Sequence, residues 1–191
     1  MREALRRLAA TGLVSFVPNR GVRVRTIARD ELRQAFMVRA ELEALVTGLA
    51  TPRMTKASLE ALAAAEEQFA ELTEELLDRR RSEAERTRLT GDWVRANYRF
   101  HDVIYEAAAV PLVERIAKSA RRTFLSRWSP GGPEIDDLYR QNVYQHRAIR
   151  EAIAAGSATG ARVLAREHVL SSWRLLEAIL EYVRERPAGR A

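Results

Sequence analysis

The three histidines of the chain are the residues whose type and spacing most directly suggest chemistry. His101, His146 and His168 each fall on the apolar stripe of a predicted helix. The stripes read Trp93, Asn97, His101 and Ile104; Leu138, Asn142, His146, Ile149 and Ile153; and Leu164, His168, Leu175 and Ile179. An apolar stripe faces the interior of a helical protein, so all three imidazoles are expected to point inward.

Buried imidazoles are costly when charged, and a divalent metal gives neutral imidazoles a common role. Asn97 lies one helical turn before His101, where its carbonyl oxygen could serve as a fourth donor. The pattern therefore indicates a metal site, with zinc or nickel as the expected ion. Three separate hydrogen-bonded core histidines are the competing interpretation. The spacing leaves both open, because it does not say which helices face one another.

Arg39 also falls on an apolar stripe, between Phe36 and Leu42. A guanidinium directed into a helical bundle is suited to bind an anion, because its planar fork matches a carboxylate. Together with a metal it would form a pocket for a small carboxylate. The alternative is an arginine at the edge of the stripe whose charged end reaches water.

Helices must position these side chains, because from Asp30 onward the sequence contains no strand pattern. Thr55 and Ser157 are typical N-caps, and Pro111 is typical of a first helical turn. We expect helices over about residues 30–51, 55–76, 91–108, 111–128, 134–155 and 157–184. The polar residues 78–90 are either a solvated helix end or a loop, and SPGGP at 129–133 is a break.

The first residues differ from the rest of the chain. MREALRRLAATG predicts a short helix, and the runs 13–17 and 22–25, joined by PNRG, predict a β-hairpin. A helix and a hairpin of this size bury little surface, so they are expected to be the end of another domain. The predicted fold is mostly α: an antiparallel bundle of six to seven helices over residues 28–191, preceded by this remnant over residues 1–27.

Composition restricts the kind of protein. There are no cysteines, which excludes disulfides and thiolate metal sites. The sequence has neither an apolar run long enough to span a membrane nor a signal peptide, so a cytoplasmic protein is expected. The net charge is +6, and residues 1–29 hold seven arginines against Glu3 alone. This marks the N-terminal end as the basic one.

Several segments, in this order, resemble the GntR family of bacterial transcription regulators, in the branch with an all-helical FCD effector domain. REALRRLAATGLV followed by PNRG is similar to the recognition helix and wing of its winged helix-turn-helix domain. VRAELE at 38–43 resembles the start of the effector domain, NYRFH at 97–101 its D-x-x-x-H motif, QHRAIREAI at 145–153 its EHRAI-type segment and REHV at 166–169 its final R-x-H.

The resemblance implies roles for individual residues. His101, His146 and His168 would be the family's metal ligands, and Arg39 would hold the carboxylate of an effector. Asn97 stands where many members carry Asp, which makes the site less negative and its metal affinity lower. Arg2 and the wing residues Asn19, Arg20 and Gly21 would contact operator DNA. The winged helix-turn-helix is expected to be truncated, and a solvated basic face is the alternative role for these arginines.

The predicted function is a homodimeric, ligand-responsive transcription regulator whose helical domain binds a divalent metal and a small organic acid. We do not expect an enzyme, although three histidines with an open coordination position are compatible with a metal-dependent hydrolase. Asn97 cannot act as a general base, which argues against hydrolysis. A third possibility is an effector-binding module that no longer binds DNA.

Overall fold

The computed structural model describes the chain except for residues 1–2, 7–13, 18–20, 25–28, 123–132 and 186–191. Residues 3–6 are helical, and the hairpin pairs β1, Val14–Val17, with β2, Gly21–Val24. The strands are antiparallel, with Val14 opposite Val24 and Val17 opposite Gly21. Gly21 has a φ of +87°, a conformation that glycine adopts at no steric cost. The predicted remnant helix and hairpin are confirmed in these described residues.

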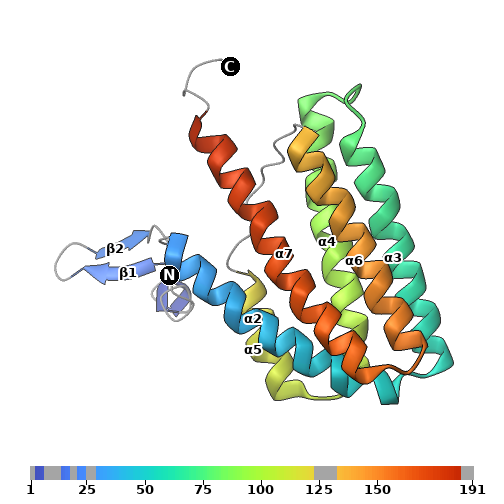
Figure 1. Ribbon diagram of the computed structural model, residues 1–191. Coiled ribbons are helices and arrows are strands. Elements are labelled where there is room, and N and C mark those ends of the chain that lie inside the picture. The colour runs from blue at the N-terminus through green and yellow to red at the C-terminus, as the bar shows by residue number, and fades with distance from the viewer. Residues whose placement is uncertain (1–2, 7–13, 18–20, 25–28, 123–132, 186–191) are drawn as a thin grey trace.

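Six α-helices follow the hairpin in the described part of the chain. They are α2, Arg29–Ala50; α3, Lys56–Leu77; α4, Glu83–Ala108; α5, Pro111–Arg122; α6, Pro133–Ala154; and α7, Ala158–Glu185, with a short 3-10 turn, Thr51–Arg53, after α2. Figure 1 shows α3, α4, α6 and α7 side by side, with α4 and α6 running opposite to α3 and α7. The predicted helical bundle is therefore confirmed.

Helix ends follow local chemistry. The Thr55 hydroxyl accepts from the Ser58 backbone N–H at 3.1 Å, which caps α3 as predicted. Gly156 stops α6 with a φ of +71°. The predicted start of α4 at Gly91 is wrong, because the helix begins at Glu83 after the N-cap Ser82. Ser82 and Glu85 form a capping box there, so residues 83–90 of the polar segment, left open as a solvated helix end or a loop, are two more turns of α4.

Three apolar clusters form the core of the part of the chain that the structure describes. One, around Phe100, Ile104 and Ile149, lies toward the end of the bundle where α4 and α6 finish. A second, around Phe69 and Trp93, lies nearer the beginning of those helices. The third joins α2 to α7 through Phe36, Val169 and Trp173 and their neighbours. The candidate site lies between these clusters, where the inward faces of α2, α4, α6 and α7 meet.

Candidate functional site

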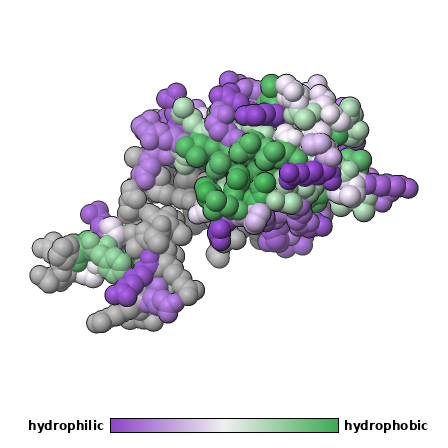
Figure 2. All heavy atoms as spheres, turned by 90° about the horizontal axis from the view of Figure 1, so that it is seen from below, coloured by the Kyte–Doolittle hydropathy of each residue, from purple (hydrophilic) through white to green (hydrophobic). Residues whose placement is uncertain are grey.

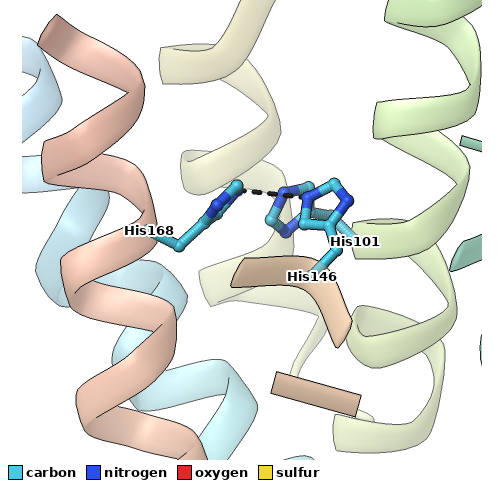
Figure 3. A group of neighbouring side chains, drawn as sticks. All are labelled: His101, His146 and His168. Carbon is cyan, nitrogen blue, oxygen red and sulfur yellow. Dashed lines mark hydrogen bonds between the residues drawn. The ribbon is translucent and has the colours of Figure 1, made fainter. Parts of the chain in front are cut away.

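The three histidines lie together in the interior of the bundle (Figure 3). They come from α4, α6 and α7, and their side chains belong to residues that are at most 2% exposed. One ring nitrogen of each lies within 4.8 Å of the others, and Nε2 of His146 is 3.2 Å from Nε2 of His168. The prediction that all three point inward is confirmed, and the helices that carry them do face one another.

Aromatic packing fixes the central ring. His146 stacks on Phe100, with ring centroids 4.1 Å apart and planes 15° from parallel. Phe69 packs against the same imidazole at 4.4 Å. These two phenylalanines belong to different core clusters, so His146 is held where the clusters join. Its Nδ1 is buried and has no hydrogen-bond partner among the described residues.

Glu43 of α2 is the carboxylate next to the histidines, and it is 2% exposed. Its Oε2 lies 3.3 Å from Nδ1 of His101, and its Oε1 accepts from Nε of Arg39 at 3.4 Å. A carboxylate that accepts from Nδ1 fixes the tautomer in which Nε2 of His101 carries the free lone pair. That Nε2 is buried and has no partner among the described residues.

Gln145 plays the corresponding part for His168. Its Oε1 lies 3.3 Å from Nδ1 of His168, and an amide oxygen can only accept. With the Gln145 amide in this orientation, Nδ1 of His168 carries the proton and the lone pair is on Nε2. Nε2 of His146 lies 3.2 Å from this Nε2, within hydrogen-bonding distance. His101 and His168 thus both turn Nδ1 toward an oxygen acceptor and leave Nε2 for the space that the three rings share.

Charge at the site follows from burial and partners. Burial lowers the pKa of His146 and His168 well below the usual value, and repulsion from neighbouring cationic groups, Arg39 among them, lowers it further. Burial alone would raise the pKa of Glu43, but attraction and hydrogen bonding from His101, together with Arg39 and Tyr105, outweigh this and lower it. The site therefore combines two neutral imidazoles, those of His146 and His168, with the ionised carboxylate of Glu43.

These residues fit a divalent metal ion. Metal-bound histidines must be unprotonated at the coordinating nitrogen, and their other nitrogen normally donates to a carboxylate or carbonyl. His101 and His168 meet both conditions. Two nitrogens on one zinc-type ion, each about 2.1 Å from it, lie roughly 3.0 to 3.4 Å apart at angles of about 90° to 110°. The 3.2 Å between Nε2 of His146 and Nε2 of His168 falls in that range.

The other predicted residues lie as follows. Asn97 is on α4, one turn before His101, and its Oδ1 is buried without a partner among the described residues. Arg39 is 8% exposed, so it is a buried cation and the interpretation as an arginine reaching water is wrong. Gly21 is exposed at the start of β2. Arg2, Asn19 and Arg20 lie outside the described residues.

Glu43 and Gln145 are the polar residues at the site that the sequence did not identify. Glu43 had a detectable signal, because it follows Arg39 by four residues on the same buried stripe of α2. Gln145 precedes His146 directly, and adjacent residues on a helix do not share a face. Its contact runs to α7, which only the packing of α6 against α7 reveals.

The lowered pKa values predict how stability depends on pH. Below about pH 6.5 the unfolded histidines bind protons that the folded His146 and His168 do not bind, so stability falls as the pH falls. We expect the free energy of unfolding to fall as the pH is lowered from 7.5 to 5.5, by up to about 1.4 kcal/mol per pH unit for each of the two histidines. Urea unfolding measures it, with EDTA present to keep metal ions from binding the imidazoles. Glu43 stays ionised throughout this window and does not contribute.

A variant with both His146→Leu and His168→Leu is the control, because it removes both titrating groups and keeps apolar volume. Its unfolding free energy should change little across the same pH window. Equal stability of the parent at pH 7.5 and 5.5 would contradict the neutral, buried state of the two imidazoles.

Comparison with known proteins shows which domain family and which solved structures this bundle is similar to. Residues 34–171 match the FCD domain. The structure is similar to E. coli McbR/YncC, at 22% identity, with a TM-score of 0.70 over 93% of this chain and 83% of that one. Lar of Listeria monocytogenes is 20% identical, with a TM-score of 0.60 over 97% and 79% of the two chains. A GntR-family regulator from Pseudomonas syringae pv. tomato is 19% identical, with a TM-score of 0.55 over 97% and 71%.

Comparison with curated proteins gives no match. Among the described residues, no helix is both long enough and apolar enough to cross a membrane. The FCD match covers the segment from α2 to α7, which includes Arg39, Glu43 and all three histidines. The predicted resemblance to the FCD branch of the GntR regulators is thereby confirmed, and the chain belongs to the FCD domain family.

Proposed function

We propose that this chain is a ligand-responsive, DNA-binding transcription regulator whose helical domain binds a divalent metal and a small organic acid. The observation that carries the proposal is the buried group of three histidines beside the Arg39–Glu43 pair, inside an FCD domain.

The metal would be held by His101, His146 and His168, with Asn97 as a fourth donor. Support for Asn97 comes from its buried Oδ1, which has no donor among the described residues and lies one turn from His101. Imidazoles suit zinc and nickel alike, and an amide oxygen adds no charge. When bound, the ion would supply positive charge and an open coordination position for a carboxylate.

Arg39 would hold the carboxylate of the effector. Its hydrogen bond to Glu43 within the described residues uses Nε, so the two Nη groups are the ones suited to a further anion. Glu43 fixes the position of the guanidinium and is itself fixed by His101. The arginine and the histidines are thereby tied to each other through one side chain.

We infer that residues 1–27 form part of a winged helix-turn-helix and residues 28–191 the effector-binding domain. The antiparallel hairpin supports the assignment of a wing. Gly21 begins its second strand and follows Asn19 and Arg20 in the sequence. Arg2 would lie on the recognition helix. A regulator of this kind acts on operator DNA, and therefore in the cytoplasm.

A homodimer is also part of the proposal, because a pair of DNA-binding domains contacts the two half-sites of an operator. Figure 2 shows apolar side chains gathered on the lower face of the bundle. The exposed apolar side chains of the contacting helices α2 and α5 include Val38, Leu45, Leu112 and Ile116. These suit contact with a second copy, and a monomer in sedimentation velocity would contradict it.

A metal-dependent hydrolase is the second candidate, favoured only by the three histidines. Such an enzyme needs a base beside the metal to take a proton from water. Glu43 is the carboxylate nearest His101, but one of its oxygens is engaged by Arg39 and the other by His101. It therefore orients its neighbours and is not available as a base. Turnover of simple esters by the zinc-loaded protein would reverse this assignment.

We expect His146→Ala to lower bound metal and thermal stability together. The change removes one donor and leaves a cavity between Phe69 and Phe100, which costs about 2 kcal/mol or more. Elemental analysis after dialysis against zinc gives the metal content, and thermal unfolding with and without EDTA separates the two effects.

Asn97→Asp is the matched variant, because it adds a charged donor of the same size. It should raise metal affinity, measured by competition with a chromogenic chelator. Equal metal content in His146→Ala and the parent would contradict the site, and unchanged affinity in Asn97→Asp would remove Asn97 from it.

Arg39→Lys should weaken carboxylate binding and leave metal content unchanged. Lysine keeps the charge beside Glu43 but lacks the planar fork that bonds a carboxylate twice. Calorimetry with carboxylic acids of two to six carbons measures the effect, which should be about tenfold or more for any acid that the parent binds. The same affinity in both proteins would exclude Arg39 from the pocket.

DNA binding is tested on the DNA upstream of the gene. Fluorescence anisotropy would compare this chain with one extended upstream of Met1 in the same reading frame. We expect the extended chain to bind with an affinity that falls steeply with salt and changes when a bound acid is added. Absence of binding by both chains would favour the third candidate, an effector-binding module that does not contact DNA.

A further inference from the structure

An open groove lies between α2 and α7 on the surface of the bundle. Its volume is about 440 Å³, and its lining is mostly apolar. Met37 and Val38 are more than half exposed and stand at its edge. Phe36 of α2 and Trp173 of α7 are only 6% and 9% exposed, so they form its floor. We call these two rings the aromatic pair.

The aromatic pair is the layer between the groove and the residues around the histidines. The two ring centroids lie 5.6 Å apart. Cζ of Arg39 lies 5.7 Å from the centre of the Phe36 ring, and Nε of Arg39 donates to Glu43 at 3.4 Å. Glu43 in turn lies 3.3 Å from Nδ1 of His101. The polar interior of the bundle therefore begins directly behind Phe36.

A solute reaches the histidines only when the side chains around them move, because all three are at most 2% exposed. Toward α3 and α4, His146 is covered by Phe69 and Phe100, which are wholly buried. Toward α2 and α7, the cover is the partly exposed aromatic pair. The two helices are joined at the groove by Arg166 and Glu41, an exposed ion pair that holds them weakly. Opening on this side displaces the least packing.

We infer that the aromatic pair is a gate, and that solutes enter and leave the histidine site through the groove when Phe36 and Trp173 turn aside. Such an opening moves a few side chains and leaves the rest of the fold intact. The Arg39–Glu43 pair behind the gate has opposite charges, so it opposes neither a cation nor a small anion. For a metal as the solute, the inference rests on the proposed function.

Chemical modification measures entry without a metal. Diethyl pyrocarbonate modifies unprotonated imidazoles, and the three histidines of this chain all lie at the site. Each modified histidine, identified by mass spectrometry of peptides from the metal-free full chain, therefore reports entry. We expect histidines in Phe36→Ala to be modified about tenfold or more faster than in the parent, because the smaller side chain makes local opening easier.

Leu76→Ala is the control for loss of stability alone. Leu76 is 1% exposed on α3, in the cluster around Phe69 and Trp93, and it does not line the groove. The variants are compared at urea concentrations that give equal free energies of unfolding. Leu76→Ala should then be modified at least about threefold more slowly than Phe36→Ala. Equal rates would mean that global unfolding exposes the histidines, and would overturn the inference.

Phe36→Leu is a milder variant that retains most of the apolar volume and so protects the fold. Its modification rate should lie between those of the parent and Phe36→Ala. A rate no higher than that of the parent would contradict the assignment of Phe36 to the gate.

Closing the groove is the converse test. The chain has no cysteine, so Glu41→Cys with Arg166→Cys introduces one thiol on each helix at the groove and no others. A short bismaleimide joins α2 to α7, and the same variant capped at each thiol with N-ethylmaleimide is the control. We expect the joined protein to be modified about tenfold or more slowly than the capped one. Equal rates in the joined and capped proteins would overturn the inference.

Zinc alone is the second probe. A gate changes the rates of entry and release together, so EDTA should remove zinc from Phe36→Ala faster while the zinc affinity stays within about threefold of the parent value. Faster release with proportionally weaker affinity would make Phe36 a support of the site and overturn the gate. Absence of zinc binding by the parent would count against the proposed function, and the modification rates would then decide the inference.

Discussion

The interaction on which the site depends is the pairing of Glu43 with two partners from different directions. An ionised carboxylate inside a protein is strongly unfavourable unless each of its oxygens is engaged. Arg39 on the same helix engages one, and His101 on α4 engages the other. This requirement fixes the rotation of α2 about its axis. It also fixes the tautomer of His101, and so decides which nitrogen is presented to the other two imidazoles.

The other polar side chains at the site, His146, His168 and Gln145, are uncharged. His146 lies between two phenylalanines, and His168 is oriented by the amide of Gln145. Burial keeps both rings neutral, which is the state in which imidazole binds a metal. Because these rings stand where the core clusters join, a ligand for them would stabilise the packing of three helices at once.

Much of the architecture could be predicted from the sequence because it is locally encoded. Thr55, Pro111 and Gly156 mark helix ends by chemistry that acts over one turn, and the apolar stripes placed every histidine inward. The start of α4 was mispredicted because residues 83–90 are largely polar, and only the Ser82–Glu85 capping box reveals the extra turns. The contact of Gln145 with His168 was not predictable, since it depends on how α6 packs against α7.

Helix α2 is attached to α7 in different ways at its first turn and further along. Arg39 lies ten residues from the start of the helix at Arg29, a rise of about 15 Å along a rigid rod. At that end Arg29 bonds to Glu177 and Glu181 of α7, the helix that also carries His168. This clasp is exposed to solvent and easily screened, so it offers little resistance to sliding of one helix past the other. The first turn of α2 is thus held to α7 by exposed charges, whereas further along the same two helices meet through the buried Phe36, Val169 and Trp173.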